Sequence, residues 1–520
     1  MADIVEDFLK AHGPCLSGEV AQHLIGSVGV SAVAARKRVS RVSGEVRRLG
    51  YITFPRKARF MYLQQQFGSP VYWQNLVRAL LETNSAYGLA IAALRQRGGL
   101  IPAKHFSIAC GAPVKQARHL SPDTILKRLS EAGLVQKSDV PGLGDCVLPI
   151  QHPEYYDDKA ADVRVRLITE DFLLTAIRDW LRKLGIVSYD KVTTRDAESL
   201  PMVGTFAWDL TAPSYLGFMV KSGKDRTLKP GFVACDVFLG ETVTADCIRP
   251  FINKCKTLRS LQKVGACMQI FVASNYDSTA FQLLKENGII PATPNHLFGE
   301  EVAQGLIGLS AVLKKAAITA IDPAEFDGLF KKFGKIEGAA TQLRGTLFEY
   351  LVADVARKTM STDIKMNRIF KSDDDKKAEA DVIAIKEGLS ITFIECKGYS
   401  PYGEVPDAYV ERWLQHNVPI FYKETRKHPD WKNLKVHFEF WVTGTLSGAA
   451  LSMIETAKKK INPNRYTIDL RLGPQILKIC QSTNDEGLST AFKKHFMKFD
   501  SNATTPQETV FGAGASNLSN

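Results

Sequence analysis

The sequence lacks the motifs that mark several large classes of protein. It has no GxxxxGK(S/T) segment, so we expect no nucleotide-driven motor in this chain. Its nine cysteines include no CxxC pair and its ten histidines no HxH or HExxH motif, which argues against a zinc site or a disulfide framework. No apolar run approaches the roughly 18 residues of a membrane helix. Because the first residues do not resemble a signal peptide, we expect a reducing, cytoplasmic location and no membrane contact.

The chain does have length and an excess of positive charge. At 520 residues it is too long for one hydrophobic core, so several domains are expected. It has 67 Lys and Arg against 55 Asp and Glu, a formal net charge of +12. Such a balance favours a polyanionic partner, although a basic protein without such a partner would have the same composition.

Residues 1–66 predict three short helices followed by a β-hairpin. The third helix is expected in "SAVAARKRVSRVSGEVRRLG", which would include Arg47 and Arg48, and the hairpin in "YITFPRKARFMYL". This order resembles a winged helix-turn-helix, whose third helix and hairpin tip contact DNA through basic side chains. The candidate DNA-binding residues are Arg36, Lys37, Arg38, Arg41, Arg56, Lys57 and Arg59. The alternative is a protein-docking winged helix with a solvated basic face.

The rest of the chain predicts three further domains and a tail. Residues 67–155 repeat the first pattern with fewer basic residues, which indicates a second winged-helix-like domain that packs or binds DNA. Residues 156–325 and 335–500 each show the order helix, strand pair, helix, strand, helix, which indicates a duplicated α/β architecture. Residues 501–520 are polar and predict a disordered tail. The predicted fold class is multidomain α+β and α/β.

Three charged residues lie near the end of a predicted hairpin in the last domain. The text "EADVIAIKEGLSITFIECKG" predicts two strands joined at Lys-Glu-Gly, which sets Asp381 across from Ile394 or Glu395. Successive side chains of a strand point to opposite faces of the sheet, so Glu395 and Lys397 are expected on the same face. Two adjacent carboxylates repel each other unless a divalent cation lies between them, and their oxygens suit Mg²⁺ or Mn²⁺. Apolar neighbours such as Phe393 predict a central strand, against the alternative of a salt bridge on an edge strand.

Asp381, with Glu395 fourteen positions later and Lys397 after it, resembles the PD-(D/E)xK, or restriction-endonuclease-like, nuclease superfamily over about residues 335–500. The resemblance implies that the two carboxylates bind the metal and that the lysine assists the attacking water. The helix "RGTLFEYLV" offers Glu349 as a further metal ligand, similar to Holliday-junction-resolvase and Mrr-like members. The Pro of the family motif is absent from this sequence, in which Glu379 and Ala380 precede the aspartate.

The first α/β domain matches this pattern only in part. Asp209 and Asp236 align with the two carboxylates, but Phe238 stands where the lysine is expected. We therefore predict a degenerate copy kept for packing or DNA contact. The alternative is a second active centre in which Lys221 or Lys224 replaces the lysine.

The resemblance and the basic N-terminal domains together imply a Mg²⁺-dependent endonuclease, with Mn²⁺ as a possible substitute, that cleaves double-stranded DNA. Recognition domains joined to a cleavage domain suggest restriction or anti-phage defence. One alternative is a structure-specific repair or junction nuclease. Another is a non-catalytic winged-helix DNA-binding regulator or scaffold. A homodimer or a partner subunit is compatible with each of these functions.

Overall fold

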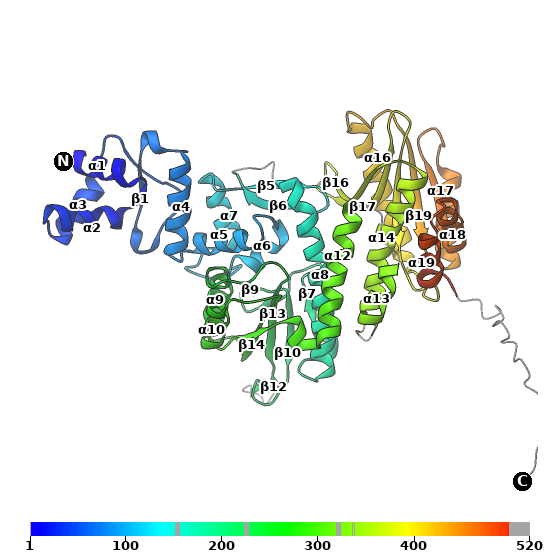
Figure 1. The fold of residues 1–520 in the computed structure, drawn as a ribbon, viewed down its shortest axis with the longest axis horizontal. Helices are drawn as coiled ribbons and strands as arrows, with labels where there is room; N and C mark the ends of the chain where they lie inside the picture. Colours follow the sequence, from blue (N-terminus) through cyan, green and yellow to red (C-terminus); the bar gives the residue numbers. More distant parts are fainter. Residues whose placement is uncertain are drawn as a thin grey trace, which may run out of the picture.

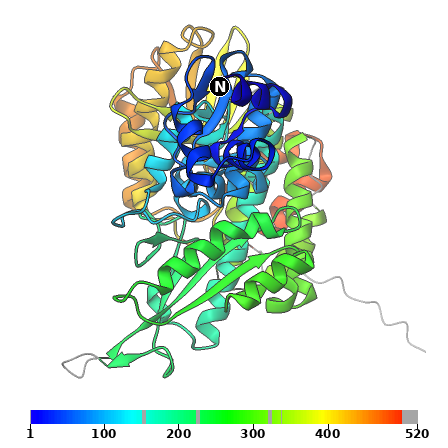
Figure 2. The same ribbon diagram turned by 90° about the vertical axis from the view of Figure 1, so that its left-hand side faces the viewer.

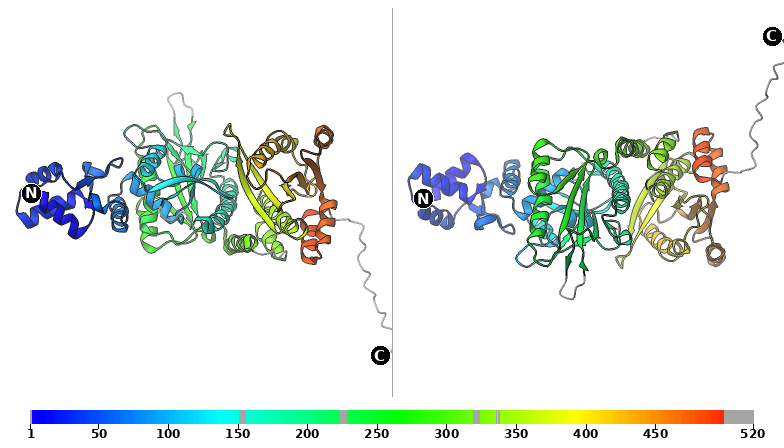
Figure 3. Two further views of the ribbon diagram at one scale, coloured as in Figure 1. Left: turned by 90° about the horizontal axis from the view of Figure 1, so that it is seen from above. Right: turned by 90° about the horizontal axis from the view of Figure 1, so that it is seen from below.

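The computed structural model describes residues 2–150, 156–222, 228–318, 324–334, 336 and 338–498. Within these ranges the chain is a multidomain protein of mixed α and β structure. We call residues 2–66 the first unit, 67–150 the second, 156–318 the third and 338–498 the fourth. The first and fourth units lie at opposite ends of the long axis (Figures 1 and 3). The predicted tail, 501–520, lies outside the described residues.

The first unit holds three helices and a small sheet. Its elements are α1 (Ala2–His12), β1 (Cys15–Leu16), α2 (Ser17–Val28), α3 (Ala32–Arg41), β2 (Val46–Arg48) and β3 (Phe60–Leu63), with strand order β1-β3-β2. The three predicted helices are present, but α3 ends at Arg41, well short of the predicted end near residue 50. Gly44 turns the chain with a φ of 90°, and β2 then pairs with β3. The strand predicted at residues 51–54 is therefore wrong, and Pro55–Lys57 forms a short 3₁₀ turn.

The second unit repeats the topology of the first. Its elements are α4 (Pro70–Glu82), α5 (Ala86–Gln96), β4 (Ile101–Pro102), α6 (Ala103–Ala109), α7 (Pro122–Glu131), β5 (Val135–Val140) and β6 (Gly144–Pro149). Its sheet has the order β4-β6-β5, which is again first, third, second along the chain. Phe54 and Phe60 of the first unit belong to the same hydrophobic core as Leu76 and Leu94, so the two units pack against each other.

The third unit is built on a five-stranded sheet, β7-β10-β13-β14-β15. Its elements are α8 (Tyr156–Lys183), β7 (Thr193–Thr194), β8 (Met202–Val203), β9 (Phe206–Ala207), β10 (Leu210–Ser214), β11 (Lys221–Ser222), β12 (Leu228–Lys229), β13 (Gly231–Phe238), α9 (Ala245–Arg259), β14 (Cys267–Ala273), α10 (Ser278–Glu286), β15 (Ile290–Ala292), α11 (Pro294–Phe298) and α12 (Glu300–Ile318). Figure 2, with the first unit toward the viewer, shows this sheet displaced to one side of the long axis.

The fourth unit has a sheet of the same topology, β16-β17-β18-β19-β20. Its elements are α14 (Ala339–Thr359), β16 (Asp363–Lys371), β17 (Lys377–Lys386), β18 (Ser390–Lys397), α15 (Asp407–Arg412), a π-helix (Trp413–Asn417), α16 (Val418–Lys427), β19 (Lys435–Val442), α17 (Gly448–Lys460), β20 (Thr467–Leu472), α18 (Gly473–Ser482) and α19 (Glu486–Phe496); α13 (Ala324–Phe333) precedes them. In both sheets the first three strands are antiparallel and the last two run parallel to the third. The predicted duplication of architecture is confirmed.

The third and fourth units share one hydrophobic core. Phe172 of α8, Leu309 of α12, Leu347 of α14 and Trp441 of β19 all belong to it. The three helices α8, α12 and α14 lie between the two sheets (Figure 1). A shared core fixes the two sheets relative to each other, because separating them would expose this apolar surface to water. Among the helices that the structure describes, none has both the length and the apolar character required to cross a membrane.

Candidate active site

The predicted hairpin lies at the centre of the fourth-unit sheet. β18 pairs with β17 on one side and with β19 on the other. The register joins Val382 to Ile394, so Asp381 lies opposite Glu395, as one of the two predicted registers required. The Glu395 residue is only 8% exposed. These observations confirm the central strand and contradict the alternative of a surface salt bridge on an edge strand.

The three motif residues converge at the end of this hairpin. Lys397 Nζ lies 2.7 Å from Glu395 Oε1 and 3.7 Å from Asp381 Oδ2. The backbone N–H of Cys396 donates a 2.7 Å hydrogen bond to Asp381 Oδ2, which fixes this carboxylate against β18. An ammonium group therefore lies against both carboxylates.

Glu349 faces the same centre from α14. Its Oε2 accepts a 3.1 Å hydrogen bond from the side-chain amide of Asn367 on β16. Burial raises the pKa of Glu349, while Arg164, Asn367 and Lys397 favour its charged form. We call Glu349, Asp381, Glu395 and Lys397 the acidic site.

The acidic site holds more carboxyl groups than cationic groups. Burial raises the pKa of Asp381 well above its usual value, and the charges of Glu395 and Glu349 raise it further while Lys397 opposes them. Burial disfavours the charged form of Lys397, but Asp381 and Glu395 outweigh burial and raise the pKa of Lys397, which stays protonated. Three carboxylates thus face one ammonium group.

The chemistry of this donor set fits a hard divalent cation. Carboxylate oxygens are the ligands that Mg²⁺ and Mn²⁺ prefer, and a bound cation would favour the charged form of Asp381 against the burial and the repulsion by Glu395 and Glu349 that raise its pKa. As they are placed, the described residues contain no cluster of three or more His, Cys, Asp or Glu side chains arranged around a cation position. The ammonium of Lys397 lies close to both strand carboxylates instead.

Two buried asparagines support the carboxylates, and the motif gave no sign of either. Asn367 has a φ of 51° and interrupts the β16–β17 ladder next to Asp381. Asn417 ends the π-helix and donates a 3.2 Å hydrogen bond to Glu395 Oε2. Both are 6% exposed, and neither Oδ1 atom has a hydrogen-bond partner among the described residues. Irregular backbone at such positions is frequent at functional sites.

The third unit holds carboxylates at equivalent places. The backbone N–H of Val237 donates a 2.9 Å hydrogen bond to Asp209 Oδ2, the contact that Cys396 makes with Asp381 in the fourth unit. This shared contact sets the correspondence between the two sheets. The corresponding pairs are Asp209 with Asp381, Asp236 with Glu395, and Phe238 with Lys397. In the structure, Phe238 therefore occupies the position that corresponds to Lys397, as the sequence predicted.

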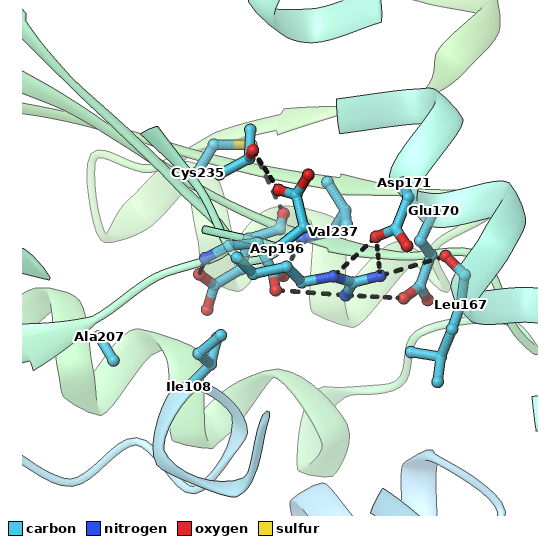
Figure 4. A network of polar contacts seen from close by, with 12 residues as sticks. Ile108, Leu167, Glu170, Asp171, Asp196, Ala207, Cys235 and Val237 are labelled. Atoms are coloured by element: carbon cyan, nitrogen blue, oxygen red, sulfur yellow. Dashed lines mark hydrogen bonds and ion pairs between the residues drawn. The ribbon is translucent and has the colours of Figure 1, made fainter. Parts of the chain in front are cut away.

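An arginine of the chain itself neutralises these carboxylates. Arg195 Nη1 lies 3.0 Å from Glu170 Oε2 and 3.3 Å from Asp209 Oδ1, while Nε and Nη2 donate to Asp171 at 3.0 and 2.9 Å. Figure 4 shows Glu170, Asp171 and Leu167 around this guanidinium. Burial disfavours the charged form, but Asp209, Asp171 and Glu170 outweigh it and raise the pKa of Arg195. We call these four charged residues the Arg195 network.

A lysine neutralises the remaining carboxylate. Lys254 of α9 is fully buried, forms an ion pair with Asp236 and donates to the backbone oxygens of Ala207 at 2.9 Å and of Ile108 at 3.2 Å. Ile108 belongs to α6, so the second unit covers this centre. The adjoining cavity measures about 20 Å³, room for about one water molecule.

Of the two lysines proposed as substitutes, only Lys221 lies within the described residues, and it is not found in this centre. Lys221 lies on β11 and forms no ion pair with Asp209 or Asp236 among the described contacts, and Lys224 lies outside the described residues. The cations that do neutralise the two aspartates are Arg195 and Lys254. The alternative in which Lys221 completes a second active centre therefore gains no support.

The predicted DNA-binding residues all lie on the surface of the first unit. The exposed residues are Arg36, Lys37, Arg38, Arg41, Arg56, Lys57 and Arg59. Lys37, Arg38 and Arg41 border a groove of about 390 Å³ beside α1 and α2. Arg48 differs from the prediction, because it lies on β2 and donates to the backbone oxygens of Val39 and Val42 at 2.9 and 2.8 Å. Arg48 thus caps the end of α3.

Comparisons of the chain with protein-family models, with curated proteins and with solved structures found no match.

Proposed function

We propose that the chain is a Mg²⁺-dependent endonuclease that hydrolyses phosphodiester bonds in double-stranded DNA. In this proposal the fourth unit is a PD-(D/E)xK nuclease domain, the third is its degenerate copy, and the first two units are winged-helix domains. The observation that carries the proposal is the meeting of Asp381, Glu395 and Lys397 at the end of a central strand, with Glu349 facing them.

Each residue of the acidic site has a distinct role in this proposal. Asp381, Glu395 and Glu349 would hold Mg²⁺ or Mn²⁺, which supplies a water of lowered pKa and neutralises charge on the phosphate. Lys397 is kept protonated by its neighbours, so it donates hydrogen bonds to oxygens that carry negative charge. Its place beside both carboxylates suits it to orient the attacking water or to stabilise the phosphate.

The basic surface of the first unit supports duplex DNA as the partner. Its exposed arginines and lysines lie on α3 and on the segment that joins β2 to β3, and such charges bind backbone phosphates with a strong dependence on salt. DNA-reading units joined to a cleavage unit fit restriction or anti-phage defence in the cytoplasm. A homodimer, or a partner subunit, would allow both strands to be cut.

Cleavage of defined DNA substrates tests the proposal. The purified full-length chain is incubated with supercoiled plasmid, linear duplex, four-way junction and single-stranded DNA, in Mg²⁺, Mn²⁺ or EDTA. We expect metal-dependent cleavage of duplex DNA and its loss in Lys397→Ala. The matched control is Lys386→Ala, which removes an exposed lysine from the far end of β17.

The same assay separates the alternatives. Preference for the four-way junction would indicate a repair or junction nuclease. DNA binding without cleavage of any substrate would overturn the enzymatic proposal and favour a regulator or scaffold. Equal cleavage by the wild type and Lys397→Ala would place the chemistry elsewhere in the chain.

A further inference from the structure

The second unit is fixed to the fourth unit beside the acidic site. Asp145 in the β5–β6 hairpin forms a 2.5 Å ion pair with Lys377 of β17. Gly144, at a φ of 71°, packs so closely on β16 that a Cβ atom there would lie 2.7 Å from Ile369 Cδ1. The strands contacted are the two that carry Asn367 and Asp381. The second unit therefore forms one wall of the region around the acidic site.

Helix α8 passes through the same junction. Val163 belongs to a small core with Val140 of the second unit, and Phe172 lies in the core shared by the third and fourth units. Arg164 follows Val163 directly. Its Nη1 atom lies at the β5–β6 turn, where a Cβ atom added to Gly142 would be only 3.0 Å from it. The same added Cβ atom would be 3.9 Å from the backbone oxygen of Met366 on β16. Met366 precedes Asn367, the partner of Glu349.

This position brings the positive charge of Arg164, from outside the fourth unit, next to the strand that carries Asn367. Arg164 is the strongest of the influences that favour the charged form of Glu349, ahead of Asn367 and Lys397. Arg164 and Lys104 of α6 also favour the charged form of Glu379, whose pKa burial raises. Glu379 lies two residues before Asp381 on β17, so the two carboxyl groups share one face of the strand.

Neither cation is held by a direct contact with the residues that the structure describes. Arg164 is half-buried and Lys104 is exposed, and neither has a hydrogen bond or ion pair to any residue that the structure describes. Arg166, two residues further along α8, differs, because it donates to the backbone oxygen of Arg97 at 3.3 Å and lies near Glu170. The guanidinium nitrogens of Arg164 are not among the buried unpaired atoms of the described residues, so the group is open to an anion, and arginine matches phosphate oxygens in a bidentate contact.

We propose that Arg164, with Lys104 as a second contact, binds a backbone phosphate of duplex DNA next to the phosphodiester bond that is cut. The second unit and α8 would then complete the substrate site of the fourth unit, and the nuclease domain alone would hold DNA poorly. This inference rests on the proposed function for the position of the cut. The phosphate contact itself is a property of binding and is measured without cleavage.

Fluorescence anisotropy with a duplex oligonucleotide tests the contact. Ca²⁺ replaces Mg²⁺ so that binding is read without hydrolysis, and affinity is measured over a range of salt concentrations. For Arg164→Ala we expect about tenfold weaker binding and a log–log salt slope that is smaller by about 1. Lys104→Ala, at an exposed position, should reduce the slope similarly without affecting folding. Arg164→Lys should keep most of the slope.

Arg178→Ala is the matched control, because Arg178 is another half-buried arginine of α8, fourteen residues and about 21 Å along the helix. Mn²⁺ binding followed by electron paramagnetic resonance is the second readout. Unchanged DNA affinity and slope in both Arg164→Ala and Lys104→Ala, with weaker Mn²⁺ binding in the former, would show that Arg164 only neutralises Glu349 and would overturn the inference. A reduced slope in a chain that cleaves no DNA would uphold the contact and overturn the proposed function alone.

Discussion

The carboxylates of the third and fourth units occupy the same places on the same kind of sheet, and they differ in what neutralises them. In the third unit a buried arginine and a buried lysine from other elements pair with Asp209 and Asp236. In the fourth unit the only lysine in contact with both strand carboxylates, among the described residues, is Lys397 on the same strand. Buried carboxylates need a counter-charge. In the third unit each of the two strand aspartates has a cation of its own, whereas in the fourth unit Asp381 and Glu395 share Lys397.

This difference explains how one fold can lose a site and keep its shape. Phe238 removes the strand lysine, while Arg97 and Arg166 stack over the phenyl ring at 5.5 and 5.4 Å. Arg195 lies between Glu170 and Asp209, where it binds both carboxylates. An internal cation is always present, so the third unit needs no metal to be stable. The fourth unit would gain from a metal because its two strand carboxylates share one lysine.

Removing Arg195 should have the largest effect on stability. Arg195→Met leaves Glu170 and Asp209 buried without their cation, and breaking a buried ion pair in this way costs about 3–5 kcal/mol. Urea unfolding monitored by circular dichroism measures the change, with Arg178→Met on α8 as the control. Mg²⁺ should not restore the Arg195→Met variant, whereas it should offset the loss in Lys397→Met. If Mg²⁺ restored the stability of both variants, the proposed difference between the third and fourth units would be contradicted.

The pH dependence of stability should carry a contribution from Asp236. Burial raises the pKa of Asp236 to about 6, although Lys254 opposes it. The folded state therefore holds this proton more tightly than the unfolded state, so the contribution to the unfolding free energy is fully present below about pH 4 and is lost as the pH rises through about 6. A shift of about two pKa units corresponds to at most about 3 kcal/mol. Urea unfolding at pH 4, 5, 6 and 7 should show a flatter profile in Asp236→Asn than in the wild type; identical profiles would contradict this pKa.

The two buried asparagines should tune metal affinity in the fourth unit. Asn417→Ala removes the hydrogen bond to Glu395, and loss of such a supporting contact typically weakens metal binding 10–100-fold. Asn367→Gly removes the contact to Glu349 but keeps the left-handed backbone that Asn367 adopts. Both changes are measured by Mn²⁺ titration, with thermal unfolding as a control for folding. Wild-type Mn²⁺ affinity in both variants would show that the asparagines only pack.

The smallest effect is expected far from both sheets. Lys37 and Arg41 are four residues apart on α3 and share a helix face. Replacing both with alanine should reduce the log–log salt slope of DNA binding by about 2 and leave Mn²⁺ binding unchanged. Arg118→Ala with Lys127→Ala, which removes two cations of the second unit, is a control of equal charge. An unchanged slope in the Lys37/Arg41 double variant would assign the first unit to protein docking.

The sequence predicted those features of the two sites that depend on residues close together in the chain. The alternation of β17 and β18 and the Gly388 turn place Asp381 and Glu395 opposite each other, and Phe238 could be read as a missing lysine. The pairing of Arg195 and Lys254 with the two aspartates could not be predicted from the sequence, because these cations reach the carboxylates from a loop and a helix through tertiary packing.

The elements that sequence reasoning missed have a common physical cause. α3 was predicted too long because its basic, apolar periodicity continues past Arg41, whereas Gly44 and the pairing of β2 with β3 end the helix. Asn367 belongs to no sequence motif. Its role follows from the left-handed backbone that it adopts within β16. Long-range pairing and local distortion thus decided the positions that periodicity alone could not.

Mn²⁺ binding to two matched variants tests the central claim, that the fourth unit holds a metal and the third does not. Glu395→Gln removes one carboxylate charge from the acidic site. Asp236→Asn with Lys254→Met removes the corresponding carboxylate together with its cation, so that no buried charge is left unpaired. We expect Glu395→Gln to abolish high-affinity Mn²⁺ binding and to reduce plasmid cleavage at least about 1,000-fold, roughly 4 kcal/mol in the barrier. The double variant should bind Mn²⁺ and cleave as the wild type does, per folded molecule. Mn²⁺ binding that survives Glu395→Gln and is lost in the double variant would contradict the assignment.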